Sequence, residues 1–413
     1  MPTTRLAVLF IFGTAFGFAQ WPQWGGPNRN FQVSGSPPLA TTWPTAGPKR
    51  VWTRPLGEGF SGMVVGGGRL YTLHNRGNRG QTGDQEVVVA IDTATGKTVW
   101  EFAYKASFTN DAEVGPGPHA SPLLDGDRLY TVGVTSKLHC LDTKTGKVVW
   151  MHDLKSEYKS SNLIYGYASS PLLYKNNIVL PVGGENHALM AFDKTTGKLA
   201  WSTGTFTNAY SSPVLINVDG QDQIVTVMKQ DVMSVDPNKP AVTWWHPQKA
   251  EYGLNVTMPV WGPGNLLFVS SSYSAGSKVL ELHQQNGKTT VKELWDGYRL
   301  NVHHTNVVRI GDVVYGSTGM SGPAPLTAVE VRTGKVLWQD RQFSKANMVV
   351  ADGKVIVLDQ DGMLALTILS PQGCKVLAKA QVMEKLAWTP PVLAGTKLYV
   401  RDRKTLVALE LGR

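Results

Sequence analysis

The sequence predicts an all-β fold, an eight-bladed β-propeller of four-stranded antiparallel blades. A hairpin motif with an acidic residue, Thr-Gly-Lys and Trp recurs along the chain. The tryptophans are spaced by about 50 residues, which is the span of one propeller blade. The 413 residues include 43 Gly and 24 Pro, and only 17% are charged. This composition is typical of a β protein with many turns.

The hairpin motif is clearest in residues 90–100, Ala-Ile-Asp-Thr-Ala-Thr-Gly-Lys-Thr-Val-Trp. A short strand ends at the acidic residue, the glycine supplies a positive φ in the turn, and a second strand carries the tryptophan. We expect the recurring indoles to wedge between neighbouring blades, each burying ~150–250 Å². The predicted structural tryptophans are Trp52, Trp100, Trp150, Trp201, Trp245, Trp295 and Trp338.

The inner half of each blade also recurs, as in residues 121–130, Ser-Pro-Leu-Leu-Asp-Gly-Asp-Arg-Leu-Tyr. A strand, a glycine turn and a second strand follow one another. Proline stands at the start of the innermost strand, where its missing N–H costs least. Related segments predict eight blades that begin near residues 62, 119, 168, 210, 256, 304, 346 and 389.

The two ends of the predicted propeller complement each other. The last blade has strands near 391–400 and 405–411 but no strand with tryptophan after them. Residues 49–54, Lys-Arg-Val-Trp-Thr-Arg, form a tryptophan strand with no hairpin before it. We therefore expect this N-terminal strand to complete the last blade. Such closure removes the unpaired strand edges that promote aggregation.

The sequence predicts three segments. Residues 1–19 read as a signal peptide, with Arg5, an apolar run, and the small residues Gly17 and Ala19 before a cut. The alternative, a membrane anchor, needs about 20 apolar residues. Residues 20–48 form an irregular Pro/Gly-rich lead-in that we expect across the propeller surface, and residues 49–413 form one propeller domain. We expect a periplasmic or secreted monomer without a membrane span.

The net charge of +9 does not by itself indicate a nucleic-acid partner. Much of the excess comes from one lysine per turn, and no arginine-rich run with interleaved aromatic residues is present. We therefore expect no nucleic-acid binding. The two cysteines, Cys140 and Cys374, fall in different repeats. An exported protein permits a disulfide, and two buried thiols are the alternative.

The Asp…Thr-Gly-Lys…Trp hairpin, with the strand pair before it, resembles the repeat of quinoprotein dehydrogenases that use pyrroloquinoline quinone (PQQ). It is equally similar to the repeat of their non-catalytic relatives, such as the propeller lipoprotein of the outer-membrane barrel assembly machinery. The opening Trp-Pro-Gln-Trp-Gly-Gly-Pro-Asn, residues 21–28, resembles the lead-in of secreted bacterial PQQ-like proteins of unknown role. The resemblance covers about residues 49–413 and implies the fold, whereas one fold hosts many activities.

A propeller presents ligands at a funnel built by the loops that lead into each blade. These loops differ between blades while the scaffold repeats, and function tends to lie in such breaks. Their cations and aromatic rings suit a planar anionic ligand, although loops are also polar by default. The candidate ligand-binding residues are His119, Tyr167, Tyr210, Glu251, Asn255, Arg299, His303, Lys345 and Trp388.

No metal site and no catalytic residue are predicted. Adjacent side chains on a strand point to opposite faces, so His303 and His304 are not expected to chelate one metal. The quinoprotein resemblance implies Ca²⁺ bound with PQQ, an acidic ligand, an Asn, an Asp base and, in many alcohol dehydrogenases, a disulfide of adjacent cysteines. This chain has no adjacent cysteine pair, and Asp111, Glu113 and Glu251 match no catalytic motif.

Two main hypotheses of function follow. The first is an exported non-catalytic binding scaffold, whose rim and funnel hold a protein or cell-envelope ligand. The alternative is a PQQ- and calcium-dependent oxidoreductase acting on alcohols or sugars, supported by the repeat type and the charged aromatic rim. A third, a polysaccharide-binding propeller, rests on the rim aromatics alone. The lack of an assignable catalytic set favours the scaffold.

Overall fold

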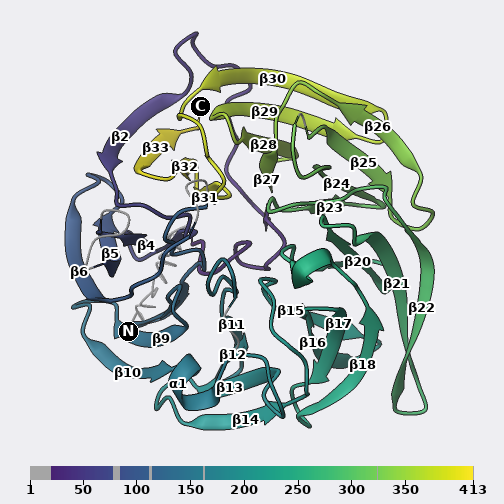
Figure 1. Cartoon of the computed structure of the whole chain (residues 1–413). Helices are drawn as coiled ribbons and strands as arrows, with labels where there is room; N and C mark the ends of the chain where they lie inside the picture. The colour runs from purple at the N-terminus through teal and green to yellow at the C-terminus, as the bar shows by residue number, and fades with distance from the viewer. Residues whose placement is uncertain (1–19, 78–83, 111–113, 161–162, 323, 413) are drawn as a thin grey trace, which may run out of the picture.

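The computed structural model describes residues 20–77, 84–110, 114–160, 163–322 and 324–412. Eight blades, each of four antiparallel strands, surround a central axis (Figure 1), which confirms the predicted fold; β1 (Gln32–Val33) adds a fifth, parallel strand to one of them. The first four blades contain β3 (Val64–Gly66), β4 (Arg69–Asn75), β5 (Gln85–Asp92) and β6 (Thr98–Lys105); β7 (Leu123–Asp125), β8 (Arg128–Val132), β9 (Lys137–Asp142) and β10 (Val148–Asp153); β11 (Leu172–Tyr174), β12 (Asn177–Pro181), β13 (Leu189–Asp193) and β14 (Leu199–Thr203); and β15 (Val214–Val218), β16 (Gln221–Val227), β17 (Asp231–Asp236) and β18 (Ala241–Pro247).

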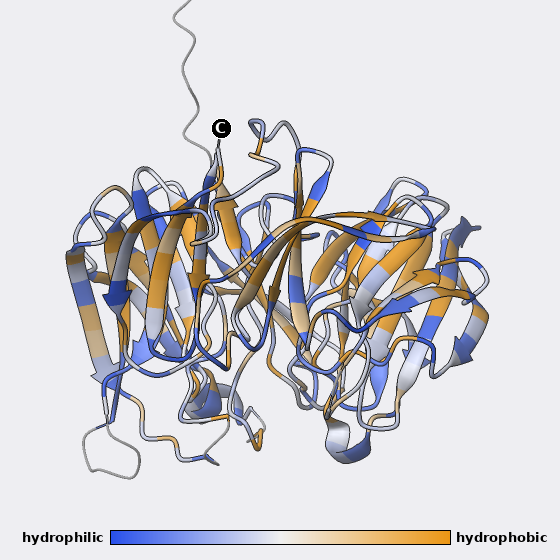
Figure 2. Ribbon diagram, turned by 90° about the horizontal axis from the view of Figure 1, so that it is seen from above, coloured by the Kyte–Doolittle hydropathy of each residue, from blue (hydrophilic) through white to orange (hydrophobic). Residues whose placement is uncertain are grey.

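The remaining four blades complete the circle. They contain β19 (Val260–Gly262), β20 (Leu266–Ser271), β21 (Gly276–Gln285) and β22 (Lys288–Gly297); β23 (Val308–Ile310), β24 (Val313–Ser317), β25 (Leu326–Glu330) and β26 (Val336–Asp340); β27 (Ala346–Ala351), β28 (Lys354–Asp359), β29 (Met363–Ser370) and β30 (Gly373–Gln381); and β31 (Val392–Ala394), β32 (Lys397–Arg401), β33 (Thr405–Glu410) and β2 (Lys49–Pro55). Apolar residues concentrate on the strands, as Figure 2 shows.

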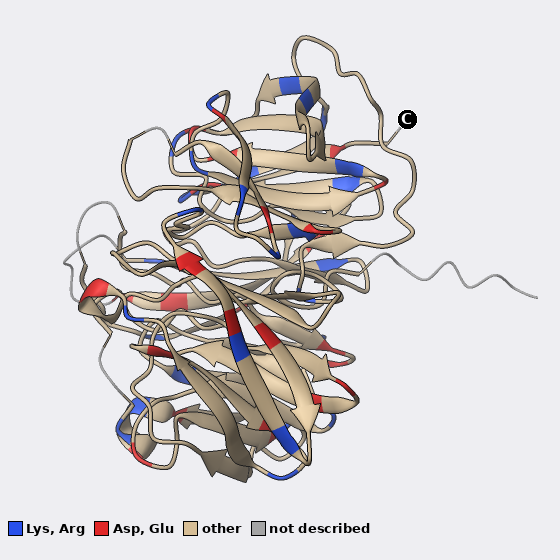
Figure 3. Cartoon of the chain, turned by 90° about the vertical axis from the view of Figure 1, so that its right-hand side faces the viewer, with Lys and Arg blue, Asp and Glu red and all other residues tan. Residues whose placement is uncertain are grey.

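Helix is rare in the described part of the chain. It comprises α1 (Leu154–Tyr158), whose N-terminus is capped by the Asp153 side chain, and the 3₁₀ turn η1 (Glu251–Gly253). Neither helix has the length and apolar content needed to cross a membrane. Basic and acidic residues are interspersed over the side of the ring seen in Figure 3. Cys140 is buried, Cys374 is half-buried, and both are free thiols.

The N-terminal strand closes the ring as predicted. β2 pairs antiparallel with β33, and Trp52 lies opposite Ala408. The last sheet therefore takes three strands from the end of the propeller and one from its beginning. Because every blade then has two neighbouring blades, no blade-to-blade face is left uncovered.

A recurring contact joins each blade to the next. The indole N–H of five predicted tryptophans donates to a backbone carbonyl in a turn of the following blade: Trp52 to Thr93, Trp100 to Thr143, Trp150 to Lys194, Trp295 to Val331 and Trp338 to Ser370, over 2.7–3.1 Å. At four of these five junctions, all except that of Trp338, the indole also lies on the glycine of that turn. A Cβ built on Gly146 would stand 2.5 Å from the ring of Trp100, and its φ is 72°.

Blade four departs from this pattern, and one prediction is wrong there. Trp245 is 57% exposed. A β-bulge instead places Trp244 opposite Ser234, where it is buried and its N–H donates to Gln223 Oε1 over 2.7 Å. The turn of this blade, residues 236–240, reads Asp-Pro-Asn-Lys-Pro and lacks the glycine. The indole N–H of Trp201, which precedes it, has no partner among the described residues.

The lead-in differs from the segment expected on the surface. It has little regular structure, but its strand β1 (Gln32–Val33) pairs parallel with β27, and Trp21 bridges to Val65 of β3. The Arg29 guanidinium donates to the carbonyls of Ser170, Pro171 and Pro213 in blades three and four. Figure 1 shows this segment crossing the middle of the ring. The eight short inner strands do not fill the channel between them, so burying Trp21 and Phe31 there is favourable.

Gly146→Ala should destabilise the protein more than Gly126→Ala does. Both glycines have a positive φ, of 72° and 58°, which costs about 1–2 kcal/mol for an alanine. The Gly126 position is open, whereas the new methyl at position 146 must displace Trp100, adding about 1–3 kcal/mol. Urea unfolding of the two variants and the wild type measures the difference. Equal losses would show that the indole contact is not tightly packed.

Candidate functional site

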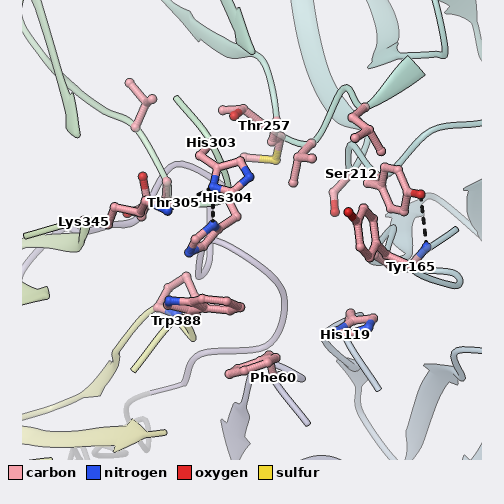
Figure 4. A pocket seen from close by; sticks show the side chains of 18 of the residues that line it. Phe60, His119, Tyr165, Ser212, Thr257, His303, His304, Thr305, Lys345 and Trp388 are labelled. Atoms are coloured by element: carbon pink, nitrogen blue, oxygen red, sulfur yellow. Dashed lines mark hydrogen bonds between the residues drawn. The ribbon is translucent and has the colours of Figure 1, made fainter. Parts of the chain in front are cut away.

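A cavity of about 680 Å³ opens on the axis at the funnel end of the propeller. All eight loops that lead into the blades contribute to its wall; one residue of each, in blade order, is Phe60, His119, Tyr165, Tyr210, Thr257, His304, Lys345 and Trp388. Figure 4 shows most of these side chains around a common space. The lead-in supplies Trp24 and Phe31, which pack edge to face with their centroids 5.2 Å apart. The lead-in thus contributes an apolar part of the cavity wall.

Five of the nine predicted ligand-binding residues line this cavity: His119, Tyr210, His303, Lys345 and Trp388. Other lining residues in the same loops, notably Phe60, Tyr165 and His304, were not predicted. Phe60 lies in the loop that leads into blade one, and Tyr165 lies two residues before the predicted Tyr167. Their loop position was therefore the signal that could have identified them. Tyr273 was missed because it lies in a loop within blade five, between β20 and β21.

The other four predicted residues lie outside the cavity wall. Tyr167 is buried and its hydroxyl donates to the Pro181 carbonyl over 2.8 Å. The Asn255 amide donates to the carbonyls of Met228 and Gln248, so it holds neighbouring loops together. Glu251 and Arg299 are exposed. Asp111 and Glu113 lie outside the described residues.

A cluster of nitrogen atoms forms one side of the cavity. His303 Nδ1 lies 3.2 Å from Lys345 Nζ and 2.9 Å from His304 Nδ1, and His303 Nε2 lies 2.6 Å from the Tyr273 hydroxyl. The lysine ammonium can only donate, so His303 Nδ1 accepts from it, and His303 Nε2–H then donates to the Tyr273 oxygen.

The expectation that His303 and His304 face opposite ways is wrong. Their rings lie 4.6 Å apart and both line the cavity. The alternation of side chains applies to extended strands, and β23 begins only at Val308. Residues 303 and 304 stand in an irregular loop, so neighbouring side chains can turn to the same side.

The imidazoles of the cavity are neutral at pH 7. Burial lowers the pKa of His119 to about 4. Burial, with the charge of Lys345 as a further cause, lowers the pKa of His303 to about 4. Burial, with His303 and Lys345 as further causes, holds the pKa of His304 well below its usual range. Among the described residues that line the cavity, only Lys345 carries a permanent charge, and none is Asp or Glu.

Aromatic rings form a second side of the cavity. Phe60 lies between Trp388 and His119, with centroid distances of 4.9 and 6.4 Å, and it is nearly parallel to the imidazole. His304 packs on the other side of Trp388 at 4.4 Å. The rings of Tyr165 and Tyr210 lie side by side in the same wall, with centroids 6.0 Å apart. The wall therefore combines flat apolar faces with neutral hydrogen-bonding groups.

These donors do not fit the calcium ion of a quinoprotein dehydrogenase. Ca²⁺ takes six to eight oxygen ligands, several of them carboxylates. The described cavity wall contains no carboxylate, and the described residues hold no group of three or more His, Cys, Asp or Glu suited to a metal ion. Lys345 adds a positive charge where a cation would have to bind.

A family profile described as the outer membrane protein assembly factor BamB matches residues 83–340. BamB of Yersinia pestis is 23% identical over 299 residues, which cover 69% of this chain and 72% of that protein. The quinohemoprotein alcohol dehydrogenase ADH IIB of Pseudomonas putida is 29% identical over 119 residues, which cover 28% of this chain. That match spans only 17% of the dehydrogenase.

Solved structures share the fold. BamB from Moraxella catarrhalis superposes with a TM-score of 0.58 at 17% identity, covering 88% of this chain and 97% of that one. The quinohemoprotein alcohol dehydrogenase from Comamonas testosteroni gives a TM-score of 0.64 at 13% identity, covering 96% of this chain and 81% of that one. The two similarities are of comparable strength, so they establish the architecture and leave the activity to the site.

Lys345→Met should raise the pKa of His303 and leave that of His119 unchanged. Burial is the largest cause of the lowered pKa of both imidazoles, and the lysine charge lowers that of His303 further. In the wild type both imidazoles should titrate near pH 4, so they stay neutral from pH 6 upward. Histidine NMR resonances followed from pH 3 to pH 8 measure both groups. A wild-type His303 that titrates above pH 6 would contradict the buried, lysine-paired geometry.

Proposed function

This chain belongs to the family of the outer membrane protein assembly factor BamB, and from that premise we propose that it is an exported, non-catalytic binding propeller. Its rim and funnel hold a protein or a cell-envelope ligand. One observation carries the proposal: the axial cavity combines aromatic faces, neutral imidazoles and a lysine, with no carboxylate among its described lining residues. Such a wall is equipped to bind rather than to hold a catalytic calcium ion.

The rim around the funnel supports a role in binding. Tyr252 and Tyr298 are 78% and 69% exposed, although both are large aromatic residues. Ser274 connects their loops, because its hydroxyl donates to Glu251 and its carbonyl accepts from the Tyr298 hydroxyl. Tyr252 also has a φ of 57°, in the left-handed region that non-glycine residues adopt less readily. Exposed tyrosines on a rigid frame are typical of interfaces.

The alternative function is that of a PQQ-dependent oxidoreductase. The aromatic wall of Trp388 and Phe60 and the similarity to quinohemoprotein dehydrogenases favour it. Two observations argue against an oxidoreductase: the described cavity wall has no carboxylate for Ca²⁺, and the sequence has no adjacent cysteines.

A photo-crosslinking residue placed at Tyr252 or Tyr298 should capture a discrete envelope component in the cells that produce the protein. The matched control is the same residue at Lys288, which is exposed at the start of β22. Adducts are separated by gel and identified by mass spectrometry. The same products at all three positions, or none at the rim, would count against a binding rim.

Adding PQQ to the mature protein should cause no saturable quenching of tryptophan fluorescence, with or without Ca²⁺. Because Trp388 lines the cavity, a quinone bound there would quench it. A dye-coupled assay over alcohols and sugars uses the same samples. Calcium-dependent quenching together with turnover would replace the scaffold with the oxidoreductase.

A further inference from the structure

We propose that the funnel cavity binds a small acidic sugar, a ring with several hydroxyl groups and one carboxylate. This inference deepens the proposed function and rests on it, because it names the chemistry of the ligand at the same site. At about 680 Å³, the cavity lies within the range of small-molecule sites, about 300–1,000 Å³. A ligand of this kind is enclosed by several loops instead of lying on the rim.

Unpaired polar atoms favour a ligand with many hydroxyl groups. Four cavity-lining side chains have a buried polar atom with no partner among the described residues: His119 Nε2, Thr257 Oγ1, His304 Nε2 and Thr305 Oγ1. They come from the loops before blades two, five and six, so they reach the cavity from different directions (Figure 4). Leaving such atoms unpaired is costly. A hydroxyl both donates and accepts, so a sugar can pair with hydroxyls and with either nitrogen state.

The aromatic wall suits the other surface of a sugar ring. A pyranose has C–H groups on its faces and hydroxyls around its edge. Trp388, Phe60 and His119 form a run of rings on which such a face can pack. A flat aromatic acid would also stack here, but it would leave the hydroxyls of Thr257 and Thr305 without partners.

The lysine on the cavity wall favours an acid. Among the described lining residues Lys345 is the only Lys or Arg, and burial lowers the pKa of the neighbouring His303 to about 4. The lysine ammonium, His303 and the Tyr273 hydroxyl are joined by contacts of 3.2 and 2.6 Å. A carboxylate beside this group gains a charge-assisted hydrogen bond. The absence of Asp and Glu from the described lining removes a source of repulsion.

The test is isothermal titration calorimetry of the mature full-length protein with four probes. D-Glucuronate and N-acetylmuramate represent a free sugar acid and one from the cell wall. D-Glucose lacks the carboxylate, and benzoate lacks the hydroxyls. We expect at least one sugar acid to bind about tenfold or more tightly than glucose and benzoate.

Lys345→Met should weaken sugar-acid binding about tenfold or more and bring it close to that of glucose. Lys288→Met, at the exposed start of β22, is the matched control and should bind as the wild type does. Circular dichroism and thermal unfolding check that the variants fold. If Lys345→Met does not fold, the comparison of glucuronate with glucose on the wild type still decides the role of the carboxylate.

Three results would overturn the proposal: no heat from either sugar acid at millimolar concentration, tighter binding of benzoate, or full affinity in a folded Lys345→Met variant. These failures are distinct from failure of the proposed function. Rim crosslinks that persist without sugar binding would keep the scaffold and remove the sugar. Calcium-dependent PQQ turnover would remove the scaffold itself.

Discussion

The packing of an indole on the turn of the next blade is the interaction on which the ring depends. The contact places two requirements on the turn. The turn must present a backbone carbonyl to the indole N–H, and it must have no side chain where the indole packs. Glycine meets the second requirement, and its positive φ also closes the hairpin. Blade four shows the contact failing, since the Trp201 indole N–H finds no partner. At the next junction, His246 and Glu293 lie 3.4 Å apart on adjacent outer strands.

The ring explains why a cavity exists, and the lead-in explains its depth. Eight blades around an axis leave a channel that the short inner strands do not fill. Residues from Trp21 to Val33 lie along this channel, and the buried Arg29 fixes them by bonds to three backbone carbonyls. Trp24 and Phe31 then close one end of the space that the funnel loops surround. The lead-in, which is not part of the repeat, therefore closes one end of the axial channel and makes it a cavity.

The fold was readable from the sequence because its motif occurs many times and each part has a physical reason. The site was readable only in part. Loop position identified His119, Lys345 and Trp388, but it does not reveal which way a side chain points. Tyr167 and Asn255 turn inward because buried loop carbonyls need donors. In blade four a β-bulge places Trp244, and not Trp245, at the buried position. Two adjacent tryptophans do not reveal which of them faces inward, because that depends on the pairing register of β17 and β18.

The pairing of β2 with β33 has a consequence for how the chain folds. Residues 49–55 are made first, but their partner strand lies at 405–410. Leu39 likewise bridges to Gly412. During synthesis, the first tryptophan strand therefore stays unpaired until almost the whole chain has been made. Contacts of such long sequence separation form slowly, and waiting strands are prone to aggregate. The closure that protects the finished ring makes its assembly the most vulnerable stage.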